Sequence, residues 1–266
     1  MCAPMGTPTS VLLGLLRACH PGPTLAVTAL VTALAVGSGQ NLVGCLFVAA
    51  AVLTGQLSVG WSNDAVDAGR DRALGRTEKP AVSGLITTRA LWVGAGLALA
   101  ACVPLSLLSG LAAGGFHLLG VAAAWSYNLG LKATVLSWVP YVIGFGQFPA
   151  FVSLGLPGEP WPAWWSVLAG ALLGVGAHLA NVLPDIDGDL KTGVHGLPQR
   201  LGPRRTRVLT AVFLVAAVAV LWWPAVVVAF GLALAPRYVR RPDAPLLSAI
   251  AVAALAVVLL LVRGTG

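Results

Sequence analysis

The acidic residues of this chain are concentrated in two places. The sequence contains nine Asp and Glu residues in 266, and six of the nine stand in two short clusters. The clusters are Asp64, Asp67 and Asp71, which follow Asn63, and then Asp185, Asp187 and Asp189. Both adjoin apolar stretches, where an ionised carboxylate is costly without a compensating partner.

The first cluster has the spacing of one helical face. Asp64, Asp67 and Asp71 stand at positions i, i+3 and i+7, so a helix that continues from the preceding apolar segment would carry all three on one stripe. Three carboxylates in a row repel one another unless a cation lies between them. An oxygen-only ligand set suits Mg²⁺. The alternative is a solvated helix end, with Arg70 and Arg72 as salt-bridge partners.

The second cluster repeats part of this pattern. Asp185 and Asp189 share a helical face at i and i+4, while Asp187 points elsewhere. Alternating acids with a glycine also begin calcium-binding EF-hand loops. That alternative fails because no Glu follows at the required position and the flanking segments are apolar. We therefore predict Asp185 and Asp189 as a second group of metal ligands.

The rest of the chain has the composition of a membrane protein. Hydrophobic residues make up 58% of the sequence and charged residues 9%, and the mean hydropathy is +0.87. Since a helix needs about 20 apolar residues to cross a bilayer, the length accommodates about eight or nine spans and excludes a large soluble domain. We predict one domain, residues 1–266, that is all-α: a bundle of about nine transmembrane helices around a central cavity.

The hydropathy pattern predicts nine spans. They are residues 24–40, 42–60, 86–108, 112–130, 134–155, 163–183, 206–221, 223–237 and 245–262. Trp222, Trp223 and Pro224 divide the seventh span from the eighth. Residues 9–20 are predicted as a short interfacial segment before the first span.

The basic residues orient these spans. With nine spans, every Lys and Arg except Arg263 falls on one membrane face, including Arg237, Arg240 and Arg241. The positive-inside rule then places the N-terminus and both Asp-rich loops in the cytoplasm, in the cytoplasmic membrane. The net charge of +7 is explained by this topology, so we expect no nucleic-acid partner.

The two acidic clusters lie four spans apart and so reach the same membrane face. Together they can bind a pair of Mg²⁺ ions around one diphosphate. Metal ions neutralise a diphosphate leaving group, and a dry pocket shelters the allylic cation that its departure leaves behind. The pattern therefore predicts a membrane enzyme that acts on an isoprenyl diphosphate.

These motifs resemble those of the UbiA superfamily of intramembrane prenyltransferases. The family pattern N-D-x-x-D-x-x-x-D appears as Asn63, Asp64, Asp67 and Asp71, and D-x-x-x-D appears as Asp185 and Asp189. The resemblance covers roughly residues 10–262. It includes stretches 76–84 and 193–202, which follow the first and the second acidic motif. Lys79 stands where the family has Arg, and Gly196 replaces a Thr.

The resemblance and the spacing together define the expected site. The metal ligands would be Asp64, Asp67, Asp71, Asp185 and Asp189, and the catalytic residues Asn63, Asp64, Asp67, Tyr127 and Asp185. The substrate-binding residues would be Arg72, Arg76, Lys79, Asn128, Lys132, His178, Asn181 and Lys191. The resemblance implies that Tyr127 lines the isoprenoid site and that Lys132 faces the diphosphate at the mouth of the site. The alternatives are that Tyr127 is an ordinary tyrosine at the membrane interface and that Lys132 only contributes to the positive-inside orientation.

Three functions are compatible with this site. The leading one is Mg²⁺-dependent transfer of a prenyl group to a lipophilic, aromatic acceptor, with Arg17 as the sole candidate contact for an acceptor carboxylate. The alternative is a membrane terpene cyclase with no acceptor, in which aromatic rings stabilise cations. Its rings would come from Trp61, Trp125, Tyr127, Trp138, Phe145, Phe148 and Phe151. A transporter is disfavoured because the acids lie at helix ends instead of at mid-bilayer depth.

Overall fold

The chain folds into a helical bundle. The computed structural model describes residues 8–239 and 241–263, and these contain helices and no strand. Arg240, one of the basic residues used for the predicted orientation, lies outside the described residues. The all-α fold class is confirmed.

The helices follow one another with short connections. The first five are α1 (Pro8–Ala18), α2 (Pro21–Gly37), α3 (Leu42–Ala73), α4 (Thr88–Leu107) and α5 (Leu111–Leu129). The remaining ones are α6 (Val139–Gly146), α7 (Phe148–Ser153), α8 (Trp164–Val182), α9 (Ile186–Lys191), α10 (Leu197–Leu221), α11 (Val226–Leu234) and α12 (Ala244–Arg263). Each of the nine apolar segments predicted from the sequence corresponds to one of these helices or to two in series, although α3 continues 13 residues beyond its predicted span and α10 begins nine residues before its own.

Four of the helical stretches are long and apolar enough to cross a membrane by themselves. They are Leu42–Ala73, Thr88–Leu107, Trp164–Lys191 and Ala244–Val262, and a fifth is obtained if α1 and α2 count as one bent span. Most of the other apolar segments are shorter or interrupted, and α5 is long enough but less apolar. The fifth predicted span, for example, is divided at Gln147 into α6 and α7, and Pro149 stands in the first turn of α7.

Two breaks predicted from proline and tryptophan are present. Helix α10 ends at Leu221, and both Trp222 and Trp223 are exposed before α11 begins. At the N-terminus, α1 meets α2 at an angle of 64°. His20 occupies the break with a left-handed φ of 53°, and Pro21 begins the next helix.

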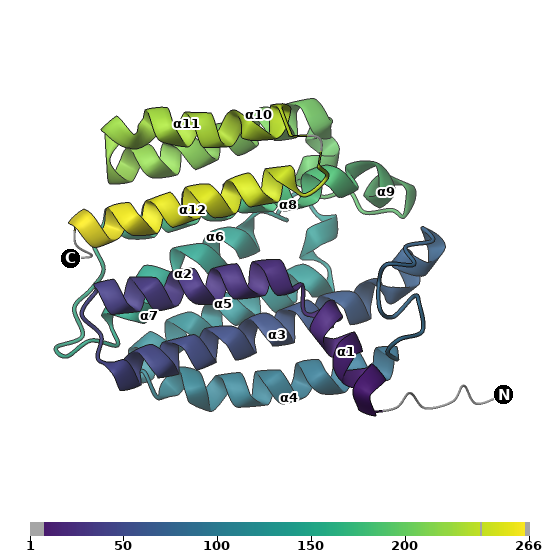
Figure 1. Cartoon of the computed structure of the whole chain (residues 1–266), viewed down its shortest axis with the longest axis horizontal. Helices are drawn as coiled ribbons and strands as arrows, with labels where there is room; N and C mark the ends of the chain where they lie inside the picture. The colour runs from purple at the N-terminus through teal and green to yellow at the C-terminus, as the bar shows by residue number, and fades with distance from the viewer. Residues whose placement is uncertain (1–7, 240, 264–266) are drawn as a thin grey trace.

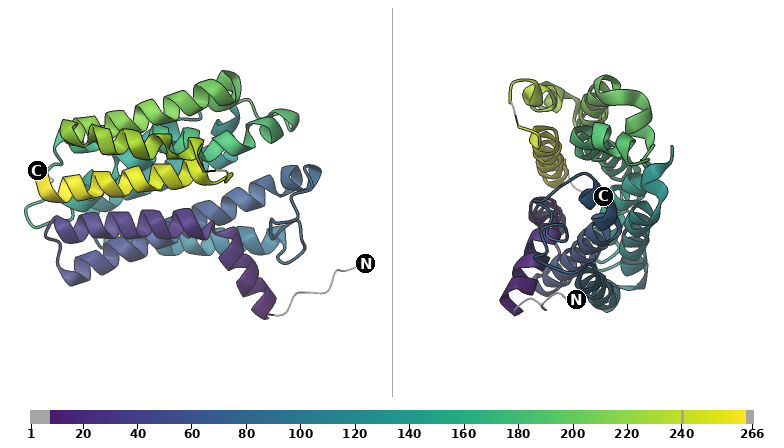
Figure 2. Two further views of the ribbon diagram at one scale, coloured as in Figure 1. Left: turned by 45° about the horizontal axis from the view of Figure 1, so that its top comes forward. Right: turned by 90° about the vertical axis from the view of Figure 1, so that its right-hand side faces the viewer.

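The long helices run roughly alongside one another, and α1 diverges from them (Figure 1). The C-terminal end of α3 and the short helix α9 lie at the same end of the bundle, so the two acidic clusters meet there. Figure 2 (right) shows the bundle end-on from this side. The core between the helices consists largely of Ala, Val and Leu, with Val48, Phe151, Leu214 and Val252 fully buried.

Glycines allow α8 to approach α6 closely. A Cβ on Gly174 would stand 2.2 Å from the carbonyl oxygen of Tyr141, and one on Gly170 would stand 2.7 Å from that of Phe145. Both obstacles are backbone atoms, which cannot rotate away. Small residues serve in this way where membrane helices pack against each other.

We expect Gly174→Ala to destabilise the fold by about 1–3 kcal/mol, because the added methyl must push α6 away from α8. The matched control is Gly96→Ala in α4, where a Cβ would meet nothing within 4 Å. That change should leave stability equal or slightly higher, since Ala favours helix over Gly. Thermal unfolding of both variants in the same detergent makes the comparison. Equal midpoints would contradict the packing argument.

Candidate active site

The acidic end of the bundle opens into one cavity of about 480 Å³. Its lining comes from α2, α3, α5, α6, α7, α8 and α12, as well as from the segments that follow α3 and α8. At the mouth it is lined by acidic residues of both clusters, namely Asp67, Asp71, Asp185 and Asp189. Deeper in the bundle the lining becomes mainly apolar. The predicted convergence of the two clusters is therefore present in the structure.

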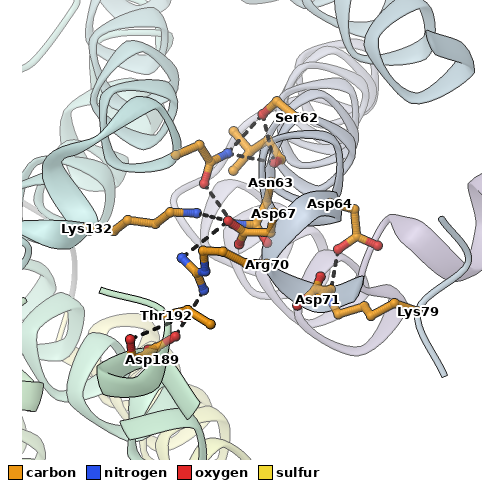
Figure 3. Close-up of polar contacts among 12 residues, drawn as sticks. Ser62, Asn63, Asp64, Asp67, Arg70, Asp71, Lys79, Lys132, Asp189 and Thr192 are labelled. Atoms are coloured by element: carbon orange, nitrogen blue, oxygen red, sulfur yellow. Dashed lines mark hydrogen bonds and ion pairs between the residues drawn. The ribbon is translucent and has the colours of Figure 1, made fainter. Parts of the chain in front are cut away.

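Asp67 lies at the centre of the mouth. Lys132, which follows α5 in the 3₁₀ turn η1 (Leu131–Ala133), donates a hydrogen bond to its carboxylate. Arg70 Nη1 approaches the same Oδ1 at 3.4 Å, and the Arg70 Nη2 atom bonds to Asp189 Oδ1 at 3.0 Å. Arg70 therefore joins the first acidic cluster to the second (Figure 3).

A second arginine makes a parallel connection. Arg76 donates from Nη1 to Asp71 Oδ1 at 3.2 Å and from Nη2 to Asp185 Oδ1 at 2.6 Å. The Asp189 carboxylate has a further partner, because Gln199 Nε2 donates to Oδ2 at 2.7 Å. In the structure, each of these carboxylates is thus held by a cation or an amide.

Asp64 lies behind two residues of the cavity lining. It is buried and is not itself part of the lining. Its Oδ1 accepts from Lys79 Nζ at 2.8 Å and lies 2.9 Å from His20 Nε2. Lys79 and His20 do line the cavity, so Asp64 contacts the site through them. Asp64 and Asp71 lie on the same side of α3, as their spacing of seven residues predicts (Figure 3).

Two asparagines connect α3 to α5 beside the acids. Asn63 Nδ2 donates to Asn128 Oδ1 at 3.1 Å, and both residues line the cavity. Asn128 Nδ2 in turn donates to the Val59 carbonyl and to Ser62 Oγ, each at 2.9 Å. This network fixes the end of α5, and with it the turn that carries Lys132.

Aromatic rings lie just inside the mouth. Tyr127 and Tyr141 both line the cavity and meet edge to face, with ring centroids 5.3 Å apart. His178 packs behind them, 5.7 Å from Tyr127 and 4.7 Å from Tyr141, and does not itself line the cavity. Its Nε2 lies 3.0 Å from Ser137 Oγ. Asn181, predicted on the same face as His178, lines the cavity and donates weakly to the Tyr141 hydroxyl at 3.4 Å.

Two of the predicted diphosphate contacts are elsewhere. Arg72 and Lys191 are exposed and do not line the cavity, so the structure does not bring them to the site. Asp187 is exposed as well, as its spacing predicted. The exposure of Arg72 follows from helix geometry, because it is five residues beyond Asp67 on a helix that carries Arg70 toward the cavity instead.

Sequence reasoning missed four residues that the structure places at the mouth. They are His20, Arg70, Tyr141 and Gln199. Arg70 could have been found from its i+3 spacing to Asp67, and Gln199 from its place in stretch 193–202. His20 carried no such signal because its contact with Asp64 spans 44 residues and depends on the bend before α2.

Lys132 is the most enclosed of the cations at the mouth. Burial lowers the pKa of its ammonium, and the neighbouring Asp67 carboxylate offsets this only in part. A partly buried ammonium remains charged only with an anionic oxygen close to it. It is suited to exchange one anionic partner for another.

The donor set fits a hard divalent cation. All the candidate ligands are carboxylate or amide oxygens, which Mg²⁺ prefers. The described residues contain no group of three or more His, Cys, Asp or Glu side chains gathered closely enough to cage a metal. Mg²⁺ does not need such a cage, since it commonly binds through one or two carboxylates, retained waters and substrate phosphates.

Comparison with solved structures finds the same fold in archaeal proteins. A UbiA homolog from Archaeoglobus fulgidus bound to GPP and Mg²⁺ has a TM-score of 0.71 and 17% identity, covering 92% of this chain and 97% of that one. The apo UbiA homolog from Aeropyrum pernix K1 has a TM-score of 0.71 and 20% identity, covering 91% and 98%. A digeranylgeranylglyceryl phosphate synthase follows with a TM-score of 0.64 and 15% identity, covering 96% and 99%.

No curated protein matches the sequence. The model of the UbiA prenyltransferase family matches residues 24–263, which is nearly the whole chain. That range includes both acidic motifs and every helix that lines the cavity. The chain belongs to the UbiA prenyltransferase family.

Proposed function

We propose that this protein is a Mg²⁺-dependent prenyltransferase. It transfers a prenyl group from an isoprenyl diphosphate to a lipophilic, aromatic acceptor and releases diphosphate. The observation that carries the proposal is the meeting of acids from two distant segments with four permanent cations at the mouth of one apolar cavity. The solved A. fulgidus relatives bound to GPP or DMAPP with Mg²⁺ support the same substrate class.

Two Mg²⁺ ions are the proposed cofactor. When bound, Mg²⁺ supplies Lewis-acid neutralisation of the departing diphosphate. Asn63, Asp67 and Asp71 would hold it from α3, and Asp185 and Asp189 from the segment after α8. Asp64, the remaining ligand predicted on α3, is paired with Lys79 and would join the metal site when that ion pair is exchanged.

The cations at the mouth are the proposed contacts for diphosphate. Arg70, Arg76, Lys79 and Lys132 line the cavity, and each is paired with an Asp. Arg offers forked donors and Lys a compact charge, both suited to phosphate oxygens. With their carboxylates shared with bound metal, these cations would be available to the diphosphate oxygens. The acids thus hold the cations in place before the substrate arrives.

Below the mouth, the cavity would hold the prenyl chain. The C1–O bond breaks with its electron pair leaving on diphosphate, an acceptor carbon attacks the allylic cation at C1, and the proton of that carbon passes to the released diphosphate. Tyr127 and Tyr141 stand at this level, and the faces of their rings can stabilise positive charge. The apolar walls exclude the water that would otherwise capture the cation.

The proposed setting is the cytoplasmic membrane. Nine spans would be formed by α2, α3, α4, α5, α6 with α7, α8, α10, α11 and α12, surrounded by membrane lipid. The N-terminus and the acidic loops would then face the cytoplasm, where the water-soluble diphosphate is released.

We expect Asp67→Asn and Asp189→Asn each to reduce turnover of an isoprenyl diphosphate at least a hundredfold, because each removes a charged ligand while keeping side-chain size. Asp187→Asn is the matched control from the same cluster, since its side chain is exposed. Activity is measured as diphosphate release in the presence of Mg²⁺. Loss of activity in the control, or full activity in both test variants, would argue against this site.

The placement of the cations makes a second prediction. Lys79→Ala and Arg76→Ala should each raise KM for the isoprenyl diphosphate about tenfold or more, because each removes a charged contact. Arg72→Ala and Lys191→Ala should change KM less than twofold, since both side chains lie outside the cavity. Steady-state kinetics on the four variants decides between these positions. A larger effect from the exposed pair would reverse the assignment.

Analysis of the reaction products distinguishes the proposed prenyltransferase from the alternative, a terpene cyclase. Of the seven aromatic residues proposed for cation stabilisation, only Tyr127, Phe145 and Phe148 line the cavity. We therefore expect no cyclised product when purified protein and Mg²⁺ are incubated with C10 to C20 diphosphates alone. Addition of a panel of phenols should yield prenylated adducts by mass spectrometry. Cyclic hydrocarbons or alcohols in the acceptor-free reaction would establish the cyclase instead.

A further inference from the structure

Two polar side chains lie among the apolar residues at the membrane-buried end of the cavity. His117 on α5 and Gln147, at the break between α6 and α7, both line the cavity there, beside Phe148. They are 3% and 6% exposed. A hydrocarbon chain has no hydrogen bonds to offer, so two polar side chains are unexpected where the end of such a chain would lie.

The hydrogen bonds around His117 define its tautomer. Ser106 Oγ lies 2.7 Å from the Cys102 carbonyl oxygen, which can only accept, so the hydroxyl proton points to that carbonyl. Ser106 Oγ is also 2.8 Å from His117 Nδ1. With its own proton engaged, Ser106 must accept there, and Nδ1 carries the ring proton. Nε2 is left as a hydrogen-bond acceptor, and no described residue donates to it.

The ring of His117 is held in this orientation. It stacks on Phe151 with centroids 4.6 Å apart and an interplanar angle of 19°. On the opposite helix, a Cβ on Gly55 would come within 3.4 Å of its Cε1 atom. The acceptor atom is therefore a permanent feature of the cavity floor.

Gln147 adds a second acceptor. Its Nε2 donates to the Gly144 carbonyl at 3.1 Å, which fixes the orientation of the amide. Its Oε1 is buried and has no hydrogen-bond partner among the described residues. A Cβ on Gly120 would stand 2.9 Å from Gln147 Cγ, so this glycine makes room for the side chain.

The depth of the floor corresponds to a definite chain length. His117 precedes Tyr127 by ten residues on α5, which is about 15 Å at 1.5 Å per residue. An extended chain advances roughly 1.2 Å per bond, so three isoprene units, or about twelve bonds, cover about 14 Å. A chain of three units starting near Tyr127 reaches His117, and a chain of two units ends well above it.

We propose that His117 and Gln147 form a polar floor that makes this site selective for a donor with two isoprene units over one with three. The inference rests on the proposed function, because it assumes an isoprenyl diphosphate held at the acidic mouth. The tail of the longer donor would cover His117 Nε2 and displace any water bound there without replacing its hydrogen bond, and it would pack against a Gln147 amide whose Oε1 it cannot satisfy, which is unfavourable. The tail of the shorter donor leaves them undisturbed.

The experiment compares the dissociation constants of C10 and C15 isoprenyl diphosphates, measured by calorimetry with Mg²⁺, in the unmodified protein and in three variants. His117→Leu replaces the ring by an apolar side chain and should shift the affinity ratio about tenfold toward C15. Gln147→Leu should shift it in the same direction. His117→Gln retains a polar side chain and should leave the ratio near that of the unmodified protein.

An unchanged ratio in both Leu variants would overturn the proposal, as would an equal shift in His117→Gln, since volume and not polarity would then be the cause. Thermal unfolding verifies that each variant is folded, and Gln147→Leu provides the test if His117→Leu is not. Turnover is recorded in parallel. Binding without any prenyl transfer would count against the proposed reaction and leave the selectivity result standing, whereas transfer with an unaltered ratio would count against the floor alone.

Discussion

The neutralisation of buried carboxylates governs the arrangement of this molecule. Five aspartates lie at the ends of apolar helices, where unpaired charge is strongly unfavourable, and four Lys and Arg side chains stand among them. The cations come from α3, from the loop after it and from η1, and two of the carboxylates come from the segment after α8. Because each carboxylate has its partner on another element, the ion pairs align the helix ends. The same pairs can be exchanged for metal and diphosphate, so one set of charges serves both folding and chemistry.

Much of this architecture could be predicted from the sequence, because hydropathy and charge are averaged over long segments. The helix that carries Asp64, Asp67 and Asp71 was expected to continue from the second span, and α3 indeed runs unbroken to Ala73. The convergence of two clusters separated by more than a hundred residues followed from counting spans between them. Neither conclusion required the position of any single side chain. The division of the fifth segment at Gln147 was not anticipated, since Pro149 was not read as a break.

Individual contacts were less predictable because they depend on the rotation of each helix at its end. Arg72 and Lys191 are close to the acids in sequence yet exposed, while Arg70 and Arg76 bridge the clusters. A side chain two positions away on a helix points about 200° around the axis, so proximity in sequence is a poor guide to a shared site. His20 reaches Asp64 only because the chain turns by 64° between α1 and α2. Such contacts depend on the tertiary structure, so no local sequence pattern predicts them.

Helix α5 connects the two ends of the cavity and gives them different physical characters. Asn128 at its C-terminal end belongs to the network beside the acids, whereas His117 lies on the floor. At the mouth, charged groups have mobile side chains and alternative partners, so binding there can be reorganised. At the floor, the histidine is fixed by Ser106 and by stacking on Phe151, and nothing nearby can move to satisfy Nε2. The prenyl chain of a ligand whose diphosphate is bound at the mouth would run along α5. The length of that chain therefore decides whether its end contacts apolar residues or the unpaired acceptor of His117.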